Sequence, residues 1–170
     1  HIRLHWRILP ECETNWECVL VSIENITALK RVEMRFHHLF TYAPISLWEE
    51  DYTAIKQEFD RLRAQGVQDI RTHLHPNPKA VDRFMSMIRV LDVNQKTLDL
   101  FEAADKETLI ANLDKVFGDK TRVHFINELA AMWDGKTFYE RESVNYSLSG
   151  QAVHVQLAWT LMPGSEDNFD

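Results

Sequence analysis

The sequence has little glycine, little cysteine and no long apolar run. Five glycines in 170 residues leave no glycine-rich loop that could cradle a nucleotide phosphate. No apolar run approaches the roughly 18 residues of a membrane-spanning helix. The two cysteines, Cys12 and Cys18, are six residues apart and form no CxxC pair. They fit a reducing cytoplasm, and no chemistry is expected of them.

Positive charge is also scarce. The chain has 19 Lys and Arg against 26 Asp and Glu, which gives a net charge of −7. Nucleic acid and anionic membranes are therefore poor candidate partners. The apolar fraction of 45%, with nine Phe, five Trp and four Tyr, suffices for one domain with a real core plus an appendage.

Recognisable catalytic sets are missing as well. The sequence has no GxSxG motif and no acid–base pair in a familiar setting. The pairs His37-His38 and His73-x-His75 are candidate metal ligands, but adjacent side chains on a helix point about 100° apart, and no Cys or carboxylate cluster follows. No metal is expected.

The two ends of the sequence repeat each other. Residues 1–17 align without a gap on residues 154–170, with six identities and five conservative replacements in 17 positions. The identical pairs are His1/His154, Leu4/Leu157, Trp6/Trp159, Pro10/Pro163, Glu13/Glu166 and Asn15/Asn168. This period of 153 residues indicates a tandem array. We therefore expect the chain to start in the penultimate strand of one module and to stop at the same point of the next.

The first 43 residues are predicted to form a hairpin followed by a helix. Apolar residues alternate in 2–8 and again in 19–23, the period of a half-buried strand. Thr27 is placed to cap a helix over 28–43 that starts at Ala28. One stripe of that helix is apolar and contains Leu29, Val32, Phe36, Leu39 and Ala43.

Two stretches of the sequence resemble PAS domains. The strand that ends on Asn25-Ile26-Thr27 and continues into a charged helix resembles the C-terminal edge of a PAS domain, where Asp-Ile-Thr-Glu is usual. Residues 88–103 place an apolar strand before Val93-Asn94 and a helix before Leu100-Phe101-Glu102-Ala103, near the PAS form Leu-Phe-Gly. Asn94 is also placed to cap the helix that opens at Gln95.

The resemblance implies an α+β fold with a PAS-like five-stranded antiparallel sheet, helices on one face and an inserted helical layer. Residues 1–27 would be the C-terminal hairpin of a preceding PAS module, 28–43 a signalling linker helix, and 44–170 a PAS module that lacks its last strand. Strands are expected at 45–49, 88–93, 137–147 and 152–162, and helices near 95–101, 106–116 and 120–133. The insertion, 51–87, has helix boundaries at Gly66 and Asn77-Pro78. It either covers the sheet edge, which we prefer, or walls a pocket.

The cleft between sheet and helices is the candidate ligand site. The residues expected to line it are Trp48, Phe101, Phe117, Phe125, Leu129, Val144 and Trp159. The alternative, that they simply fill the core, is preferred. His124 on the long helix is the haem candidate, whereas a flavin photosensor would need a cysteine in the helical region. No cofactor is expected and the protein should be colourless, although an unknown small ligand remains open.

The resemblance implies a sensory and signal-relay module of a cytoplasmic multidomain signalling protein. It would regulate an output domain, a histidine kinase of a two-component system or a diguanylate cyclase with a GGDEF domain, and would itself be no enzyme. The alternatives are a ligand-free dimerisation spacer and, less favoured, a small α+β enzyme. The expected partners are a second copy and the neighbouring PAS and output domains, without nucleic acid or membrane insertion.

Residues 17–26 are a spare copy of the strand that 44–170 would lack. We expect them to fill the slot between 45–49 and 152–162, either within one chain or, as we prefer, between two chains as a swapped dimer. The helix 28–43 carries too much apolar surface for a monomer in water. It is expected to pack against a second copy or against the open face of the sheet.

Overall fold

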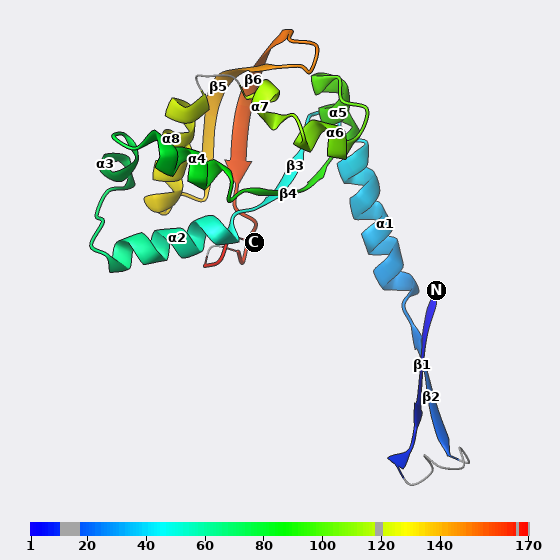
Figure 1. Ribbon diagram of the computed structural model, residues 1–170. Coiled ribbons are helices and arrows are strands. Elements are labelled where there is room, and N and C mark those ends of the chain that lie inside the picture. Colours follow the sequence, from blue (N-terminus) through cyan, green and yellow to red (C-terminus); the bar gives the residue numbers. More distant parts are fainter. Residues whose placement is uncertain (11–17, 118–120, 166, 170) are drawn as a thin grey trace. The chain divides into compact units, whose positions relative to one another are not determined.

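The computed structural model describes residues 1–10, 18–117, 121–165 and 167–169, and the fold is α+β (Figure 1). The chain divides into two compact units, residues 1–42 and 43–170. None of the described helices is long and apolar enough to cross a membrane.

The first unit is the predicted hairpin and helix. Strand β1 (Ile2–Ile8) pairs antiparallel with β2 (Val19–Asn25), and α1 (Thr27–Thr41) follows. Most of the predicted turn between the strands lies outside the described residues. Cys18 is disulfide-bonded, which corrects the expectation of a reduced cysteine, and Cys12, the other cysteine of the chain, is outside the described residues.

The second unit follows the predicted order of elements. They are β3 (Trp48–Asp51), α2 (Thr53–Ala64), α3 (Ile70–Leu74), α4 (Pro78–Met85), β4 (Arg89–Val93), α5 (Gln95–Phe101), α6 (Lys106–Ile110), α7 (Leu113–Val116), α8 (Thr121–Trp133), β5 (Phe138–Tyr146) and β6 (Ala152–Thr160). The helix expected over 106–116 is divided, because α6 ends at Ile110 and α7 begins at Leu113, with Ala111 and Asn112 as the caps between them. Gly66 has a φ of +88° just after α2, as a helix-ending glycine requires.

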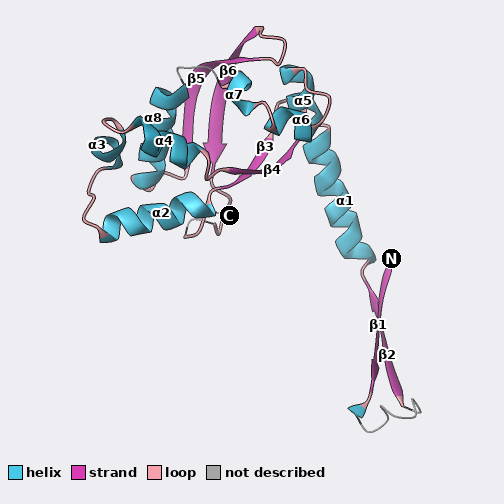
Figure 2. Cartoon of the chain, viewed as in Figure 1, coloured by secondary structure: helices cyan, strands magenta, loops and turns pink. Residues whose placement is uncertain are grey.

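The five-stranded sheet is not seen among the described strands. The strands form three antiparallel pairs instead, β1·β2, β3·β4 and β5·β6 (Figure 2). Within the described chain β2 pairs with β1 and with neither β3 nor β6. The pairing of residues 17–26 with β3 or β6, within one chain or between two chains, stays a prediction.

One face of the β5·β6 pair is covered and the other is open. Cross-strand partners such as Tyr139 and Trp159, or Arg141 and Leu157, lie on the half-buried face. Every second residue, starting with Phe138 on β5 and with Ala152 on β6 and ending with Tyr146 and Thr160, lies on the exposed face. This is the alternation expected of a sheet with helices on one side.

The second unit has two apolar cores. The larger core contains Ile55, Phe59, Leu62, Ile70, Leu74, Val81, Phe84, Phe125, Ile126, Leu129, Ala130, Met132, Trp133 and Phe169. The smaller core contains Val93, Phe101, Leu109 and Val116. Half of the larger core comes from α2, α3 and α4, and most of the rest comes from α8. The insertion therefore builds the main core together with α8, and Trp159 of β6 packs against the same core.

Candidate functional site

The residues predicted to line one cleft are divided between the two cores. Trp48 packs in the smaller core, with its ring centroid 5.9 Å from that of Phe101 and 6.3 Å from that of Phe117. Phe125 and Leu129 are buried in the larger core, and Trp159 packs against it. The predicted set therefore fills two packed clusters and does not surround one cavity.

Two predicted site residues lie away from these clusters. Val144 lies on the open face of β5 opposite His154 and is 42% exposed. It was assigned to the wrong face, since a one-residue shift along a strand reverses the side. His124, the haem candidate, is half-buried on α8 between exposed Val123 and buried Phe125. The described residues contain no group of three His, Cys, Asp or Glu side chains placed to hold a metal ion.

The junction between β2 and α1 is closed by hydrogen bonds of Asn25, Ile26 and Thr27. The Asn25 side-chain oxygen accepts from the Thr27 backbone N–H at 3.0 Å. The helix starts at Thr27 itself, with Ile26 at the cap position and no side-chain cap bond there, which corrects the expected cap. The Thr27 hydroxyl donates instead to the His1 carbonyl at 3.3 Å, and the Ile26 N–H donates to the same carbonyl at 3.1 Å.

Helix α1 buries none of its residues in the described chain. The predicted apolar stripe is present and exposed, with Leu29 57%, Phe36 58% and Leu39 66% accessible. The opposite side of the helix carries Arg31, Met34 and His38, which lie about 180° away at 100° per residue. The junction thus connects an exposed strand to a helix whose apolar face has no cover within the first unit.

A buried hydrogen-bond network around Asn94 holds the start of the second unit. The Asn94 side-chain oxygen accepts from the N–H groups of Leu47 at 3.1 Å and Thr97 at 3.0 Å, so the predicted cap of α5 is confirmed. The Asn94 amide group donates to the Ile45 carbonyl at 2.9 Å, and the Thr97 hydroxyl lies 2.8 Å from that of Ser46. The segment that follows α1 is thereby tied to the end of β4 and the start of α5.

A second set of interacting polar side chains, which the sequence did not predict, lies inside the second unit. The Tyr52 hydroxyl donates to the Glu50 carboxylate at 3.0 Å, and Arg141 Nε donates to the Glu128 carboxylate at 2.7 Å. Burial raises the pKa of Glu50 above its usual range, and the Glu128 charge adds to that rise against the Tyr52 hydrogen bond. Burial also raises the pKa of Glu128, while Arg141 opposes the rise.

No single stretch of the sequence predicts this set of polar side chains. Its members come from β3, the residue after it, α8 and β5, so they are brought together only by the fold. The indole N–H of Trp159 on the same face of β6 is buried and has no hydrogen-bond partner among the described residues. A period-2 pattern could have placed Arg141 on the inner face, but not opposite Glu128.

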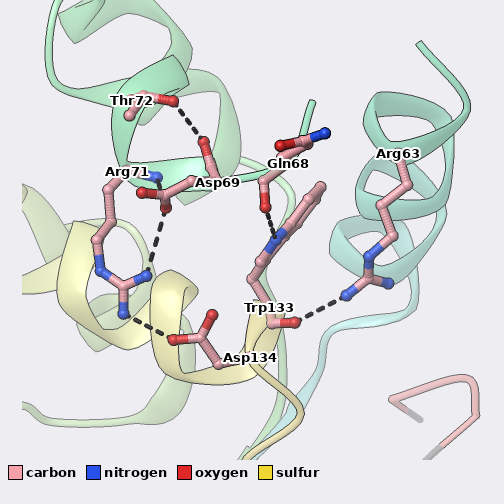
Figure 3. Close-up of polar contacts among 7 residues, drawn as sticks. All are labelled: Arg63, Gln68, Asp69, Arg71, Thr72, Trp133 and Asp134. Atoms are coloured by element: carbon pink, nitrogen blue, oxygen red, sulfur yellow. Dashed lines mark hydrogen bonds and ion pairs between the residues drawn. The ribbon is translucent and has the colours of Figure 1, made fainter. Parts of the chain in front are cut away.

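The insertion is clamped to the end of α8 by polar contacts (Figure 3). Arg63 donates to the Trp133 carbonyl at 2.8 Å, and its guanidinium carbon lies 4.4 Å from the centre of a Trp133 ring. The Trp133 indole donates to the Gln68 carbonyl at 3.2 Å. Arg71 donates to Asp134 at 2.8 Å (Figure 3). These contacts fix α2 and α3 against α8 and are explained by stability alone.

Two surface hollows accompany the insertion. One, of about 550 Å³, is lined by Gly66, Val67, Gln68, Asp69, Thr72 and His73. The other, of about 420 Å³, lies beside Glu58, whose carboxylate binds Arg61 and Arg83 and has its pKa lowered by the Arg61 hydrogen bond. Neither hollow is lined by a residue of the predicted cleft.

Comparison with known proteins finds no match. No family model, no curated protein and no solved structure is similar to the chain. The resemblance to PAS domains therefore rests on the sequence motifs alone.

Proposed function

We propose that the chain is a signal-relay and dimerisation module of PAS type, in which strand β2 passes a change of packing to helix α1. The observation that carries the proposal is the exposed apolar stripe of α1, which begins directly after the Asn25–Thr27 junction. A 15-residue helix with an uncovered apolar face is stable in water only when it packs on a partner.

The proposed partner for this stripe is a second copy of the chain. A pair of such helices has at least two ways of packing, and a shift between them would alter the segments attached to them. In a longer signalling protein the shift would reach an output domain, for which a histidine kinase or a diguanylate cyclase is the expectation that the PAS resemblance brings.

A ligand-free spacer is the second candidate function. It is favoured by the division of the predicted cleft residues between two packed cores, which leaves them surrounding no common cavity. Mass spectrometry of the protein under native conditions separates the two. A retained small molecule supports a relay module that senses a ligand, and bare protein supports a spacer without sensing.

A matched pair of substitutions in α1 tests the relay proposal. Leu39→Lys places a charge in the apolar stripe, and Met34→Lys makes the same kind of change on the opposite side of the helix. Leu, Met and Lys have similar helix propensities, so helix stability changes little in either variant. We expect Leu39→Lys to weaken self-association about tenfold or more in sedimentation equilibrium, because a lysine would have to be desolvated.

Met34→Lys should associate as the natural sequence does. If both variants associate equally well, the stripe is not an interface and the relay proposal fails.

A further inference from the structure

Strands β3 and β6 run in the same direction between the same two cores. Trp48 at the start of β3 packs on the smaller core, as does Leu148, just before the turn into β6. Tyr52, the residue after β3, packs on the larger core together with Trp159 and Leu161 at the end of β6. Each strand therefore leads from the smaller core to the larger one.

Each of these strands has one edge without a partner among the described strands. β3 pairs only with β4, and β6 pairs only with β5. Two neighbouring strands of the same direction can both pair with a single antiparallel strand between them. Unpaired backbone groups at such edges favour the addition of a strand.

One backbone hydrogen bond marks where an added strand would begin. The Tyr52 N–H donates to the Phe169 carbonyl at 2.9 Å, and Phe169 is buried in the larger core. The segment that follows β6 thus reaches the backbone of the residue directly after β3.

We infer that the free edges of β3 and β6 form an acceptor site for strand β2 of a second copy of this chain. The repeat identifies the occupant. β1 aligns on residues 155–161 at an offset of 153, which places six of its seven residues on β6, and β1 pairs with β2. A surface built like β1 should accept the same strand that β1 accepts.

The hairpin also gives the register of the added strand. Trp6 pairs with Val21 and Leu4 with Ile23, so their equivalents Trp159 and Leu157 would face Val21 and Ile23. These β2 side chains are 53% and 67% exposed in the hairpin. In the acceptor site they would extend the half-buried face of β6, whereas an isolated two-stranded hairpin is marginally stable in water.

The occupant comes from a second copy because the connection is too short within one chain. With β2 in this register, both the start of α1 and the start of β3 lie at the smaller core. α1 would carry the chain about 22 Å away, and the six residues from Tyr42 to Leu47 return it at most about 22 Å even when fully extended. They are not extended, since Tyr42 forms a turn and residues 44 and 45 are bends.

Two substitutions at one cross-strand pair test the inference in the full chain. Val21→Lys and Trp6→Lys disturb the same position of the hairpin, Val21 opposite Trp6. Only Val21→Lys places a charge in the acceptor site. We expect it to weaken self-association about tenfold or more in sedimentation equilibrium. Trp6→Lys should leave association unchanged or strengthen it, because β1 competes with the acceptor for β2.

Disulfide cross-linking tests the register, in a background with Cys12→Ser and Cys18→Ser. Ser22 and Ala158 would be opposite each other on the exposed face, so Ser22→Cys with Ala158→Cys should give a covalent dimer. Ser22→Cys with His154→Cys, four residues out of register, should give none. Equal weakening by both lysine variants, a disulfide within one chain, or no register-specific dimer would each overturn the inference.

The relay proposal is tested separately, because Leu39→Lys changes the stripe of α1 and leaves β2 intact. If Leu39→Lys weakens self-association and Val21→Lys does not, only the strand exchange is contradicted. If Val21→Lys weakens self-association and Leu39→Lys does not, only the relay through α1 is contradicted.

Discussion

Asn94 shows how one side chain holds the start of the second unit. It is 1% exposed, and its oxygen and its amide group both bind partners, Leu47 and Thr97 on one side and Ile45 on the other. The segment before β3 and the start of α5 therefore both depend on a single amide. The sequence predicted its role as a cap, since Asn before a helix is a common signal, but not its bonds to residues 45 and 47, which are almost fifty positions away.

Replacing Asn94 by Ala should lower the free energy of unfolding by about 2–4 kcal/mol, because a cap is lost and buried N–H groups are left unpaired. Asn77→Ala is the matched control. Asn77 caps α4 through one bond from the Ala80 N–H and is exposed, so about 1 kcal/mol or less is expected. Urea unfolding measures both, and equal losses would show that the buried bonds of Asn94 contribute nothing.

Ionisation of Glu50 should lower the free energy of unfolding as the pH rises. Its pKa is raised in the folded chain, chiefly by burial. The folded state therefore holds this proton more tightly than the unfolded state, and the contribution is complete below the unfolded pKa of about 4.3. It is lost as pH rises from there through the folded pKa.

Glu50→Gln should remove this slope and be more stable than the natural sequence at pH 7. Glu49→Gln, on the exposed neighbour of the same strand, is the control and should keep the slope. The measurement is urea unfolding at a series of pH values, compared as differences from the natural sequence. A Glu50→Gln protein with an unchanged slope would show that this carboxyl is not the source.

The elements of the second unit were largely predictable from local patterns. Asn77-Pro78 marked α4 and Asn94 marked α5, because caps and periodicity act within a few residues of the chain. The contacts that those elements make with one another were harder to predict from the sequence. The apolar spacing of the 120–133 helix predicts a core position for Val123, but this side chain is 61% exposed. The insertion was expected to cover a sheet edge, and only the fold reveals that its apolar faces meet α8.

Phe59 tests the role of the insertion. It is fully buried, and its ring centroid lies 5.2 Å from that of Trp133 and 5.7 Å from that of Phe84. Phe59→Ala should lower the free energy of unfolding by about 3–5 kcal/mol through lost burial and a residual cavity. Phe138→Ala, on a side chain that is 53% exposed on β5, should cost no more than about 0.5 kcal/mol.

If loss of the Phe59 ring cost no more than loss of the Phe138 ring in thermal or urea unfolding, the insertion would be a dispensable cover. Its place in the larger core would then carry no stability.

At the scale of the whole molecule, pairing between strands decides what local patterns cannot. The repeat between residues 1–17 and 154–170 could be read directly, and its strands are found as β1 and β6. The expected single sheet is instead two separate pairs in the second unit, because nothing among the described residues bridges β3 and β6. The strand that we infer to bridge them is β2 of a second copy, which a single chain could not reveal.

Hydrogen exchange of the full chain across a range of protein concentrations tests the account most directly. It predicts that the amides of β2 (residues 19–25) and α1 (residues 27–41) gain protection as concentration rises, because both pack on a second copy. The amides of α2 and α8, which lie in one core, should exchange at the same rate throughout. If β2 and α1 exchange at one unprotected rate at every concentration, both the relay through α1 and the exchange of β2 are contradicted.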